Sequence, residues 1–401
     1  MDRTLESGAG RGAGAGLTGG IVALMAASAG LCVASIYYNQ PMLGILARSF
    51  QVGPGEVSQI PMATQVGYAA GLLLLSPLGD RYERRSLIVW TTLGLAVALV
   101  AAGLAPSVGL LVLASLLVGA LATVAQQIVP MAAQLAADSE KGRVVGLVMA
   151  GLLAGILLSR TVSGVVAQFG SWRLMFLLAG LVTAALAGVL ALRLPRVRPE
   201  TSVSYPRLLL SLVELVRRHG LLNRSGVVQG LLFAGFVSFW ANLAFYLEQP
   251  PFFMGSSVAG ALGIVGLVGV FVAPLAGRLA DTGGQRRMIL LGAAAVAASF
   301  AVFWLGRGHM AALIAGIVLM DAGLQAAMVS NQARVYALDA SARSRLNTVY
   351  MTMMFMGGAI GTAIGALAFT RYGWAGVCGF GAGCAALALA LEFLSPATSA
   401  A

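Results

Sequence analysis

Long apolar runs separated by short polar breaks extend along almost the whole chain. A helix needs about 20 apolar residues to cross the roughly 30 Å hydrocarbon core of a bilayer. Twelve runs approach that length, and each is predicted to form a membrane-spanning helix. They cover residues 18–46, 59–78, 87–104, 108–136, 143–168, 172–192, 225–247, 257–276, 288–305, 310–336, 346–370 and 374–394. The pattern predicts an all-α membrane protein with twelve transmembrane helices.

Two of the polar breaks carry similar charged sequences half a chain apart. Residues 77–85 read PLGDRYERR, and residues 277–287 read GRLADTGGQRR. Their aspartates, Asp80 and Asp281, are 201 residues apart. Other landmarks repeat in the same order, such as YYNQP at 37–41 and YLEQP at 246–250. Such matches indicate an internal repeat, so we expect two pseudo-symmetric six-helix bundles.

The basic residues assign the two sides of the membrane. Of the 25 Lys and Arg residues, 19 fall on the side that holds both termini, four fall on the other side, and Arg160 and Arg334 fall inside spans. Cytoplasmic loops carry an excess of Lys and Arg. Both termini are therefore predicted to be cytoplasmic.

The longest polar segment separates the sixth run from the seventh. It holds three prolines and a short amphipathic stretch at 208–218, too little for a soluble domain. The predicted organisation is a flexible cytoplasmic tail (1–17), an N-terminal six-helix bundle (18–192), a cytoplasmic linker (193–224), a C-terminal six-helix bundle (225–394) and a cytoplasmic C-terminal tail (395–401).

Composition excludes a soluble domain. The chain is 59% hydrophobic and only 10% charged, whereas soluble domains carry roughly 25% charged residues. The net charge of +11 could suggest nucleic-acid binding. However, only one basic residue is Lys, and the Arg residues lie in short clusters between apolar runs. This pattern is typical of membrane topology, so no nucleic-acid partner is expected.

The charged breaks and the repeat resemble the major facilitator superfamily across essentially the whole chain. The second break follows the family's loop motif from Gly277 to Arg286, while the first has Ser76 and Glu83 where glycine is usual. Finer stretches, including YYNQP at 37–41 and GLLAGILLSRTVSG at 151–164, resemble bacterial arabinose-efflux-like and drug:proton antiporter permeases. This resemblance implies proton-coupled efflux of a small organic molecule by alternating access, in a bacterial inner membrane.

Two departures separate the chain from those antiporters. Ile156 and the pair Ser159–Arg160 replace the Pro and Gly residues usual in the fifth span, and the Arg often found in the fourth span is absent, with Ser115 near its place. Both departures bear on proton exchange and leave the fold untouched.

The charged breaks are the predicted gates. Carboxylates there can accept hydrogen bonds from a helix N-terminus, and arginines can pair across the two bundles in one arrangement but not in the other. The alternative is ordinary positive-inside topology. The candidate gating residues are Asp80, Arg81, Arg84, Arg85, Asp281, Arg286 and Arg287.

Charged residues inside the membrane are the candidates for proton coupling. Arg160 and Asp321 lie deep within predicted spans, where a lone charge costs at least ~2.5–3.5 kcal/mol. Each should therefore face the bundle interior, as a functional group or as a structural anchor. Glu248, at the outer end of the seventh span, is a further candidate at the mouth of the cavity or a solvated helix-end carboxylate.

Spans 1, 4, 7 and 10 line the central cavity in the resembled family. Carried over, this suggests amide and aromatic residues that could bind substrate or could bond to one another between helices. They are Tyr37, Tyr38, Asn39, Gln40, Gln126, Gln127, Trp240, Asn242, Gln325, Asn331 and Gln332.

Rival functions remain on the same sequence. An importer or a facilitator without proton coupling would use the same fold. An enzyme would need a catalytic pair or a metal set within a span, and a channel would need a ring of charge; neither pattern is visible in the sequence. We expect a monomer without cofactor or metal that binds a drug-like or sugar-like substrate, protons and the lipid bilayer.

Overall fold

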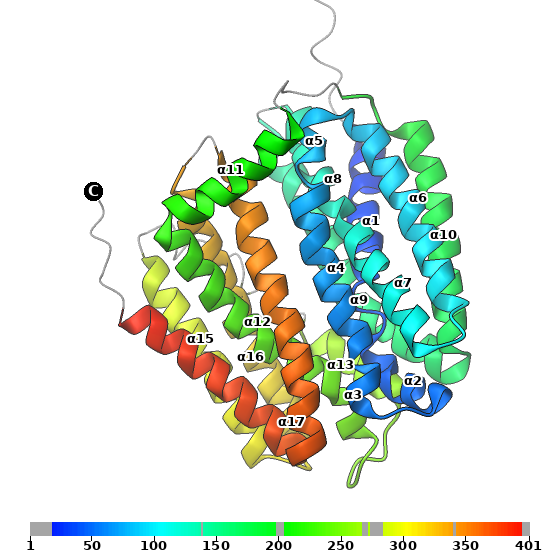
Figure 1. Ribbon diagram of the computed structural model, residues 1–401, viewed down its shortest axis with the longest axis vertical. Coiled ribbons are helices and arrows are strands. Elements are labelled where there is room, and N and C mark those ends of the chain that lie inside the picture. Colours follow the sequence, from blue (N-terminus) through cyan, green and yellow to red (C-terminus); the bar gives the residue numbers. More distant parts are fainter. Residues whose placement is uncertain are drawn as a thin grey trace, which may run out of the picture.

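The chain folds into long helices packed side by side in a computed structural model (Figure 1). The structure describes residues 18–137, 139–197, 204–266, 272, 284–339 and 342–394, without the side chain of Asp80. All regular elements of these residues are α or 3-10 helices, which confirms the predicted all-helical fold. Asp281 lies outside the described residues.

The N-terminal group of helices precedes the linker. It contains α1 (Gly19–Ala34), η1 (Gln40–Met42), α2 (Leu43–Phe50), α3 (Pro54–Val57), α4 (Gln59–Leu75), α5 (Leu78–Arg81), α6 (Arg84–Gly103), α7 (Val108–Leu121), η2 (Ala122–Val124), α8 (Ala125–Leu135), α9 (Lys141–Phe169) and α10 (Trp172–Arg193).

The C-terminal group follows the linker helix α11 (Tyr205–Arg218). It contains α12 (Gly220–Leu247), α13 (Ser256–Val265), α15 (Gln285–Leu305), α16 (Met310–Tyr336) and α17 (Arg343–Phe393). The two groups lie next to each other, with α11 near one end and α2 and α3 at the opposite end (Figure 1). We call these the linker end and the far end.

The predicted count of twelve spanning helices is not confirmed. Within the described residues, eight helices are long and apolar enough to cross a membrane. The first predicted span is interrupted between α1 and α2, and the described part of the eighth, α13, has only ten residues. The last two runs form two helices, both within α17, that are separated by a kink at Gly373. Gly373 has φ of 60°, a conformation that glycine adopts without steric cost.

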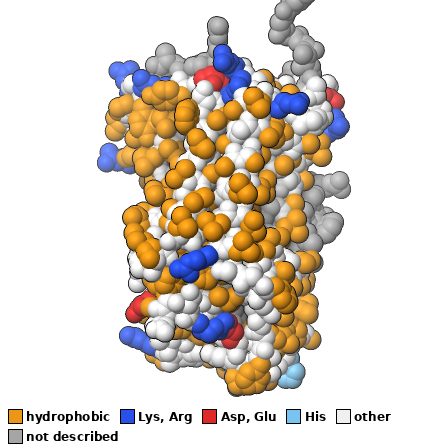
Figure 2. Space-filling view, turned by 90° about the vertical axis from the view of Figure 1, so that its right-hand side faces the viewer, with side chains coloured by type: hydrophobic (Ala, Val, Ile, Leu, Met, Phe, Trp, Pro, Cys, Tyr) orange, Lys and Arg blue, Asp and Glu red, His pale blue; other side chains and the backbone are white. Residues whose placement is uncertain are grey.

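The outer surface suits a lipid environment. Large apolar side chains such as Trp90, Leu181 and Leu305 are more than 60% exposed. Hydrophobic side chains cover the middle of the face in Figure 2, and Lys and Arg side chains lie mostly toward the linker end, with a few in the lower half toward the far end. A soluble protein rarely exposes apolar surface on this scale, so the exposed band is the expected lipid-facing surface.

Glycines allow helices within each group to pack closely. A Cβ atom on Gly155 of α9 would lie 2.2 Å from the backbone oxygen of Gly30 in α1. A Cβ on Gly357 of α17 would lie 2.3 Å from the backbone oxygen of Gly230 in α12. Small residues at such positions let backbones approach in lipid, where packing drives helix association.

The two groups contact each other strongly toward the far end. Helix α9 packs on α13, where Thr161 donates a hydrogen bond to the Gly260 carbonyl at 3.0 Å. Ser256 likewise donates to the Gly164 carbonyl at 3.0 Å. Helix α4 also packs on α17, with the rings of Tyr68 and Phe355 4.3 Å apart. These contacts close the far end of the interface.

Candidate functional site: a cavity between the two helix groups

A cavity of about 490 Å³ lies between the two helix groups. Its walls come from α4, α8, α9, α12, α16 and α17, so both groups contribute. The exposed residues Arg343 and Ser344, at the start of α17, also line it. The cavity therefore reaches the surface at the linker end, while the α9–α13 and α4–α17 contacts close the far end.

Apolar side chains form most of the cavity wall. The lining includes the rings of Tyr37, Tyr68, Phe233, Phe236 and Phe355, with methionines from α16 and α17. A few polar groups are placed among them, as is usual for small-molecule sites. The space is within the range of drug-sized ligand pockets.

Arg160 of α9 lies at the cavity wall and is only 2% exposed. Its Nε donates a hydrogen bond to Gln40 Oε1 at 2.8 Å. The centroids of the Tyr37 and Trp240 rings lie 4.6 and 4.5 Å from its Cζ. Aromatic faces attract a guanidinium within about 6 Å. The helices thus hold a buried cation by an amide and two rings from both groups.

Asp321 of α16 lies at the same cavity and interacts electrostatically with Arg160. Both residues pack against the glycine face of α13. A Cβ on Gly263 would lie 3.2 Å from Arg160 Cβ, and a Cβ on Gly266 would lie 3.1 Å from Asp321 Oδ1. Because Gly263 and Gly266 have no side chains, the N-terminal group's cation and the C-terminal group's carboxylate can share one region.

The predicted cavity residues divide into two sets. Tyr37, Gln126, Gln127, Gln325 and Gln332 line the cavity. The other six are buried behind the cavity wall. They are Tyr38, Asn39, Gln40, Trp240, Asn242 and Asn331.

The second set makes contacts between or within helices. Asn39 Nδ2 donates to Thr64 Oγ1, and Asn242 Nδ2 donates to the Ser238 carbonyl. Gln40 and Trp240 instead support Arg160. Of the first set, Gln332 donates to Tyr336 and Asn347, which ties α16 to α17 along the cavity.

Glu248 lies away from the cavity, at the far end. Its Oε2 accepts a hydrogen bond from Arg48 Nη1 at 2.6 Å. Arg48 is in α2 and Glu248 follows α12, so this ion pair joins the two groups across the closed end. In this state the Glu248 carboxylate helps to hold the far end closed.

Removing that pair should favour opening of the far end. Because the Arg48 side chain is 63% exposed, the loss in Glu248→Gln should be about 0–1 kcal/mol, or up to about fivefold in population. Distances between spin labels on α2 and on the 249–255 segment would show a larger open fraction.

A charge swap supplies the control for this prediction. Arg48→Glu combined with Glu248→Arg should restore the wild-type distances. An unchanged distribution in Glu248→Gln would mean that the pair contributes nothing to closure.

Two matching arginines of the repeat each bind the C-terminus of the last helix in their own group. Arg85 Nη2 donates to the Ala191 carbonyl at the end of α10, and Arg286 Nη2 donates to the Glu392 and Phe393 carbonyls at the end of α17. Arg85 and Arg286 are 201 residues apart, as are Ala191 and Glu392. The repeat therefore reproduces one contact in both groups, a helix C-terminus satisfied by a cation.

The remaining gate candidates differ in exposure. Arg84 is buried, donates to the Gly79 carbonyl at 3.1 Å and lines the cavity. Arg81 and Arg287 are exposed. The hydrogen bond of Arg84 to Gly79 and the contact of Arg81 with the Tyr82 ring both stay within the N-terminal group.

Glu83 has a defined structural role where the family motif has glycine. Its carboxylate accepts hydrogen bonds from the N–H groups of Arg85 and Ser86 and from the Ser86 hydroxyl, which caps α6. It also accepts from Val197 N in the linker. Partial burial raises the pKa of the Glu83 carboxyl, but these hydrogen bonds together lower the pKa below its usual value. The substitution ties the linker to the start of α6.

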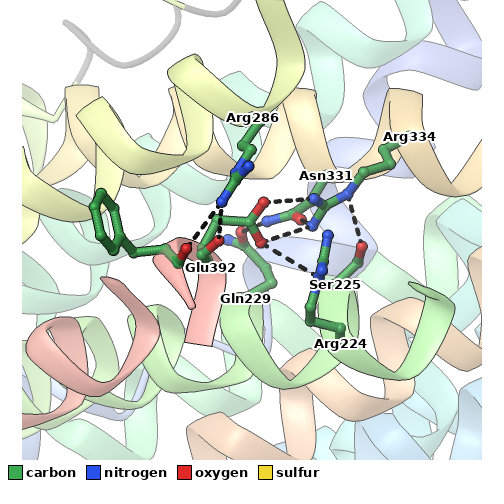
Figure 3. Close-up of polar contacts among 8 residues, drawn as sticks. Arg224, Ser225, Gln229, Arg286, Asn331, Arg334 and Glu392 are labelled. Carbon is green, nitrogen blue, oxygen red and sulfur yellow. Dashed lines mark hydrogen bonds and ion pairs between the residues drawn. The ribbon is translucent and has the colours of Figure 1, made fainter. Parts of the chain in front are cut away.

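A buried ion cluster in the C-terminal group is centred on Glu392, which was not among the predicted site residues (Figure 3). Glu392 of α17 is fully buried and pairs with Arg334 of α16 at 2.7 Å and with Arg224 of α12 at 3.6 Å. Arg334 also donates to Ser225 and to Asn331. Arginines from α12 and α16 thus meet the Glu392 carboxylate of α17, and Arg286 of α15 donates to the Glu392 backbone carbonyl.

Sequence reasoning missed the Glu392–Arg334 pair. Both residues lie near the ends of apolar runs, 58 residues apart. A charged residue that interrupts an apolar run requires a partner in the membrane. An Arg and a Glu in two such runs could therefore have been predicted to pair. At offset 201, the N-terminal group has Ala133 and Ala191 instead, so the internal repeat gave no second copy to notice.

The fold and the cavity define a multi-pass membrane transporter. The family model of the Major Facilitator Superfamily matches residues 22–340. The chain belongs to this superfamily.

Relatives and solved structures agree with this assignment. The uncharacterized transporter YgaY of Escherichia coli is 40% identical over 91% of this chain and 93% of its own. A probable transporter of Streptomyces coelicolor is 34% identical over 88% of this chain and 83% of its own. The crystal structure of the nucleoside transporter NupG has a TM-score of 0.76 at 12% identity, covering 93% of this chain and 98% of that one. This last likeness concerns the fold alone.

Proposed function

We propose that the protein is a proton-coupled efflux transporter that moves a small organic molecule by alternating access. The observation that carries the proposal is the central cavity, which is open at one end and has Arg160 and Asp321 at its wall. A single-sided cavity between two helix groups is the geometry that rocking of one group against the other requires. Direction and proton coupling draw further support from the resemblance to drug:proton antiporters.

The orientation follows from the distribution of basic residues. With the linker end in the cytoplasm, the cavity is open to the cytoplasm and an export substrate could enter it directly. A relative in Escherichia coli, 26% identical over 90% of this chain, is named inner membrane transport protein YnfM. We therefore place the protein in a bacterial inner membrane, acting as a monomer.

In the transport cycle, closure at the linker end would accompany separation of α9 from α13 at the far end. Asp80, Arg81, Arg84, Arg85, Asp281, Arg286 and Arg287 remain the proposed linker-end gate residues. Arg84 is well placed among them because it lines the cavity.

Asp321 is the proposed proton site. It lies in an apolar cavity wall beside a cation and reaches the cavity space. Protonation would remove the charge that attracts Arg160 and thereby change the interaction between the two helix groups. Coupling thus depends on one carboxylate and on one arginine from the opposite group.

Transport in inverted membrane vesicles would test the proposal. An imposed pH gradient should accelerate uptake of a substrate found by screening, and Asp321→Asn should abolish the acceleration while leaving gradient-independent exchange of substrate. We expect at least about a tenfold loss of gradient-driven uptake, because the titrating group is gone.

Glu56→Gln is the matched control, because it neutralises an exposed carboxylate of the same chain outside the cavity. It should keep most of the response. Gradient-driven uptake that survives Asp321→Asn would mean that another group is the proton site. Uptake that is independent of the gradient and unchanged by Asp321→Asn would support an importer or a facilitator without proton coupling.

A further inference from the structure

We propose that the substrate is an amphipathic organic anion whose acidic group binds Arg160. The inference rests on the proposed transport function and names the substrate class for the same cavity. Its basis is the charge, the unsatisfied hydrogen-bonding groups and the apolar surface of the cavity.

The charges that line the cavity favour an anion. Among the described lining residues, Arg84, Arg160 and Arg343 are basic, and Asp321 is acidic. These arginines extend from the linker-end opening to the interior. A cleft of one predominant sign with low-dielectric walls concentrates ligands of the opposite charge.

Arg160 has donor capacity left over. A guanidinium has five N–H donors, and here Nε is used by Gln40. Its Nη2 is buried and has no hydrogen-bond partner among the described residues. An unsatisfied donor on a buried cation is costly, so an incoming carboxylate would recover hydrogen bonds as well as charge.

Neighbouring groups around Arg160 are also donors. Gln40 Nε2 and Trp240 Nε1 are buried without partners in the described part of the chain. Gln40 contacts the Arg160 side chain, and the Trp240 ring lies 4.5 Å from its Cζ. Arg160 Nη2 and these two neighbours are thus three donors without partners among the described residues. Within the same residues, Asp321 Oδ2 is a buried acceptor without a hydrogen-bond partner at this cavity, so the donors outnumber it and could bind a further acceptor.

The rest of the wall selects an apolar body. Tyr37, Phe236, Phe233 and Phe355 lie on the cavity surface, together with leucines and methionines. A carboxylate or phosphonate could satisfy the donors equally. An aromatic or alkyl portion would occupy the remaining volume, since aromatic and Met side chains adapt to varied apolar ligands.

Asp321 competes with such an anion for Arg160. Removing the negative charge of Asp321 should therefore strengthen binding of the anion to Arg160.

Binding of matched probes to purified full-length protein tests the inference without any gradient. Phenylbutyrate, phenylbutyramide and phenylbutylamine share one apolar body and differ in charge, and phenylpropylphosphonate distinguishes carboxylate from phosphonate. We expect calorimetry to give a Kd for an acidic probe at least about tenfold lower than for the amide or the amine.

Variants assign the selectivity to Arg160. Arg160→Gln should raise the Kd of the acid to that of the amide, and Arg160→Lys should keep part of the difference because it keeps the charge. Asp321→Asn should lower the Kd of the acid by about threefold or more, because a competing carboxylate is lost.

Arg173→Gln is the control for the loss of an aromatic-stacked arginine. Arg173 lies 4.2 Å from the Trp172 ring and donates to the Ala105 carbonyl, away from the cavity lining. It should leave the Kd unchanged.

Equal affinities for the three charge types, preference for the amine, or no binding of either acid would overturn the inference. Each of these results would leave proton-driven transport standing. Gradient-independent uptake would overturn the transport proposal while leaving anion selectivity measurable.

Discussion

Replacing Glu392 with glutamine should destabilise the protein by about 3–5 kcal/mol, because it leaves a buried charge without its counter-ion. Arg334 is 7% exposed and makes two hydrogen bonds to the Glu392 carboxylate, at 2.7 and 3.2 Å. Arg224 pairs with the same carboxylate, and Arg286 donates a hydrogen bond to the backbone carbonyl of Glu392 (Figure 3). Three cations would then remain around a neutral amide. Unfolding followed by tryptophan fluorescence in detergent would measure the loss.

The chain offers a matched control for this prediction. Glu248→Gln makes the same chemical change in a pair whose arginine is 63% exposed, where the expected loss is only about 0–1 kcal/mol. The double substitution Glu392→Met and Arg334→Met should recover most of the stability, since apolar residues can replace a buried pair. Equal effects of the two Glu→Gln changes would contradict the importance of burial.

Replacing Gly260 with leucine should block closure of the far end. A Cβ at this position would lie 2.4 Å from the backbone oxygen of Arg160 in α9, and the backbone has little room to move. Overpacking costs about 1–3 kcal/mol, which corresponds to roughly a 5- to 150-fold shift away from the closed state. Transport should fall accordingly, and Thr161→Cys should become reactive to a membrane-impermeant maleimide applied from the far side.

Gly383→Leu controls for the substitution itself. Gly383 lies in a helix, and no atom lies within 4 Å of a Cβ built on it. Transport and labelling should stay at wild-type levels. If Gly260→Leu also leaves Thr161→Cys protected, then the α9–α13 contact does not set the accessibility of the far end.

The fold could be predicted from sequence because bilayer thickness sets the length of apolar runs. The repeat of the charged breaks also identified the family. The number of separate spanning helices was less accessible. Interruptions such as the one between α1 and α2 depend on local backbone conformation and not on hydropathy.

Part of the site could be predicted from the sequence, because a charged side chain is costly within a membrane. That cost pointed to Arg160 and Asp321, which the structure places at one cavity. The amide residues that line the cavity were harder to predict. Knowing which helix borders the cavity does not tell which face of that helix points into it. Asn242 and Gln325 were equal candidates, yet only Gln325 lines the cavity. Successive residues differ by about 100° around a helix, and a nearly uniform apolar sequence gives little indication of that angle.

The ion cluster at Glu392 also bears on the order of biosynthesis. Arg224 is in the first helix of the C-terminal group and Arg334 is in its penultimate element, while their carboxylate is near the end of α17. During insertion from the N-terminus, the two arginines enter the membrane region before their counter-ion exists. Intramembrane cations are costly until they are paired. The C-terminal group can therefore reach its final packing only when α17 arrives, whereas the N-terminal group, with Ala133 and Ala191 at the matching positions, can settle without such a delay.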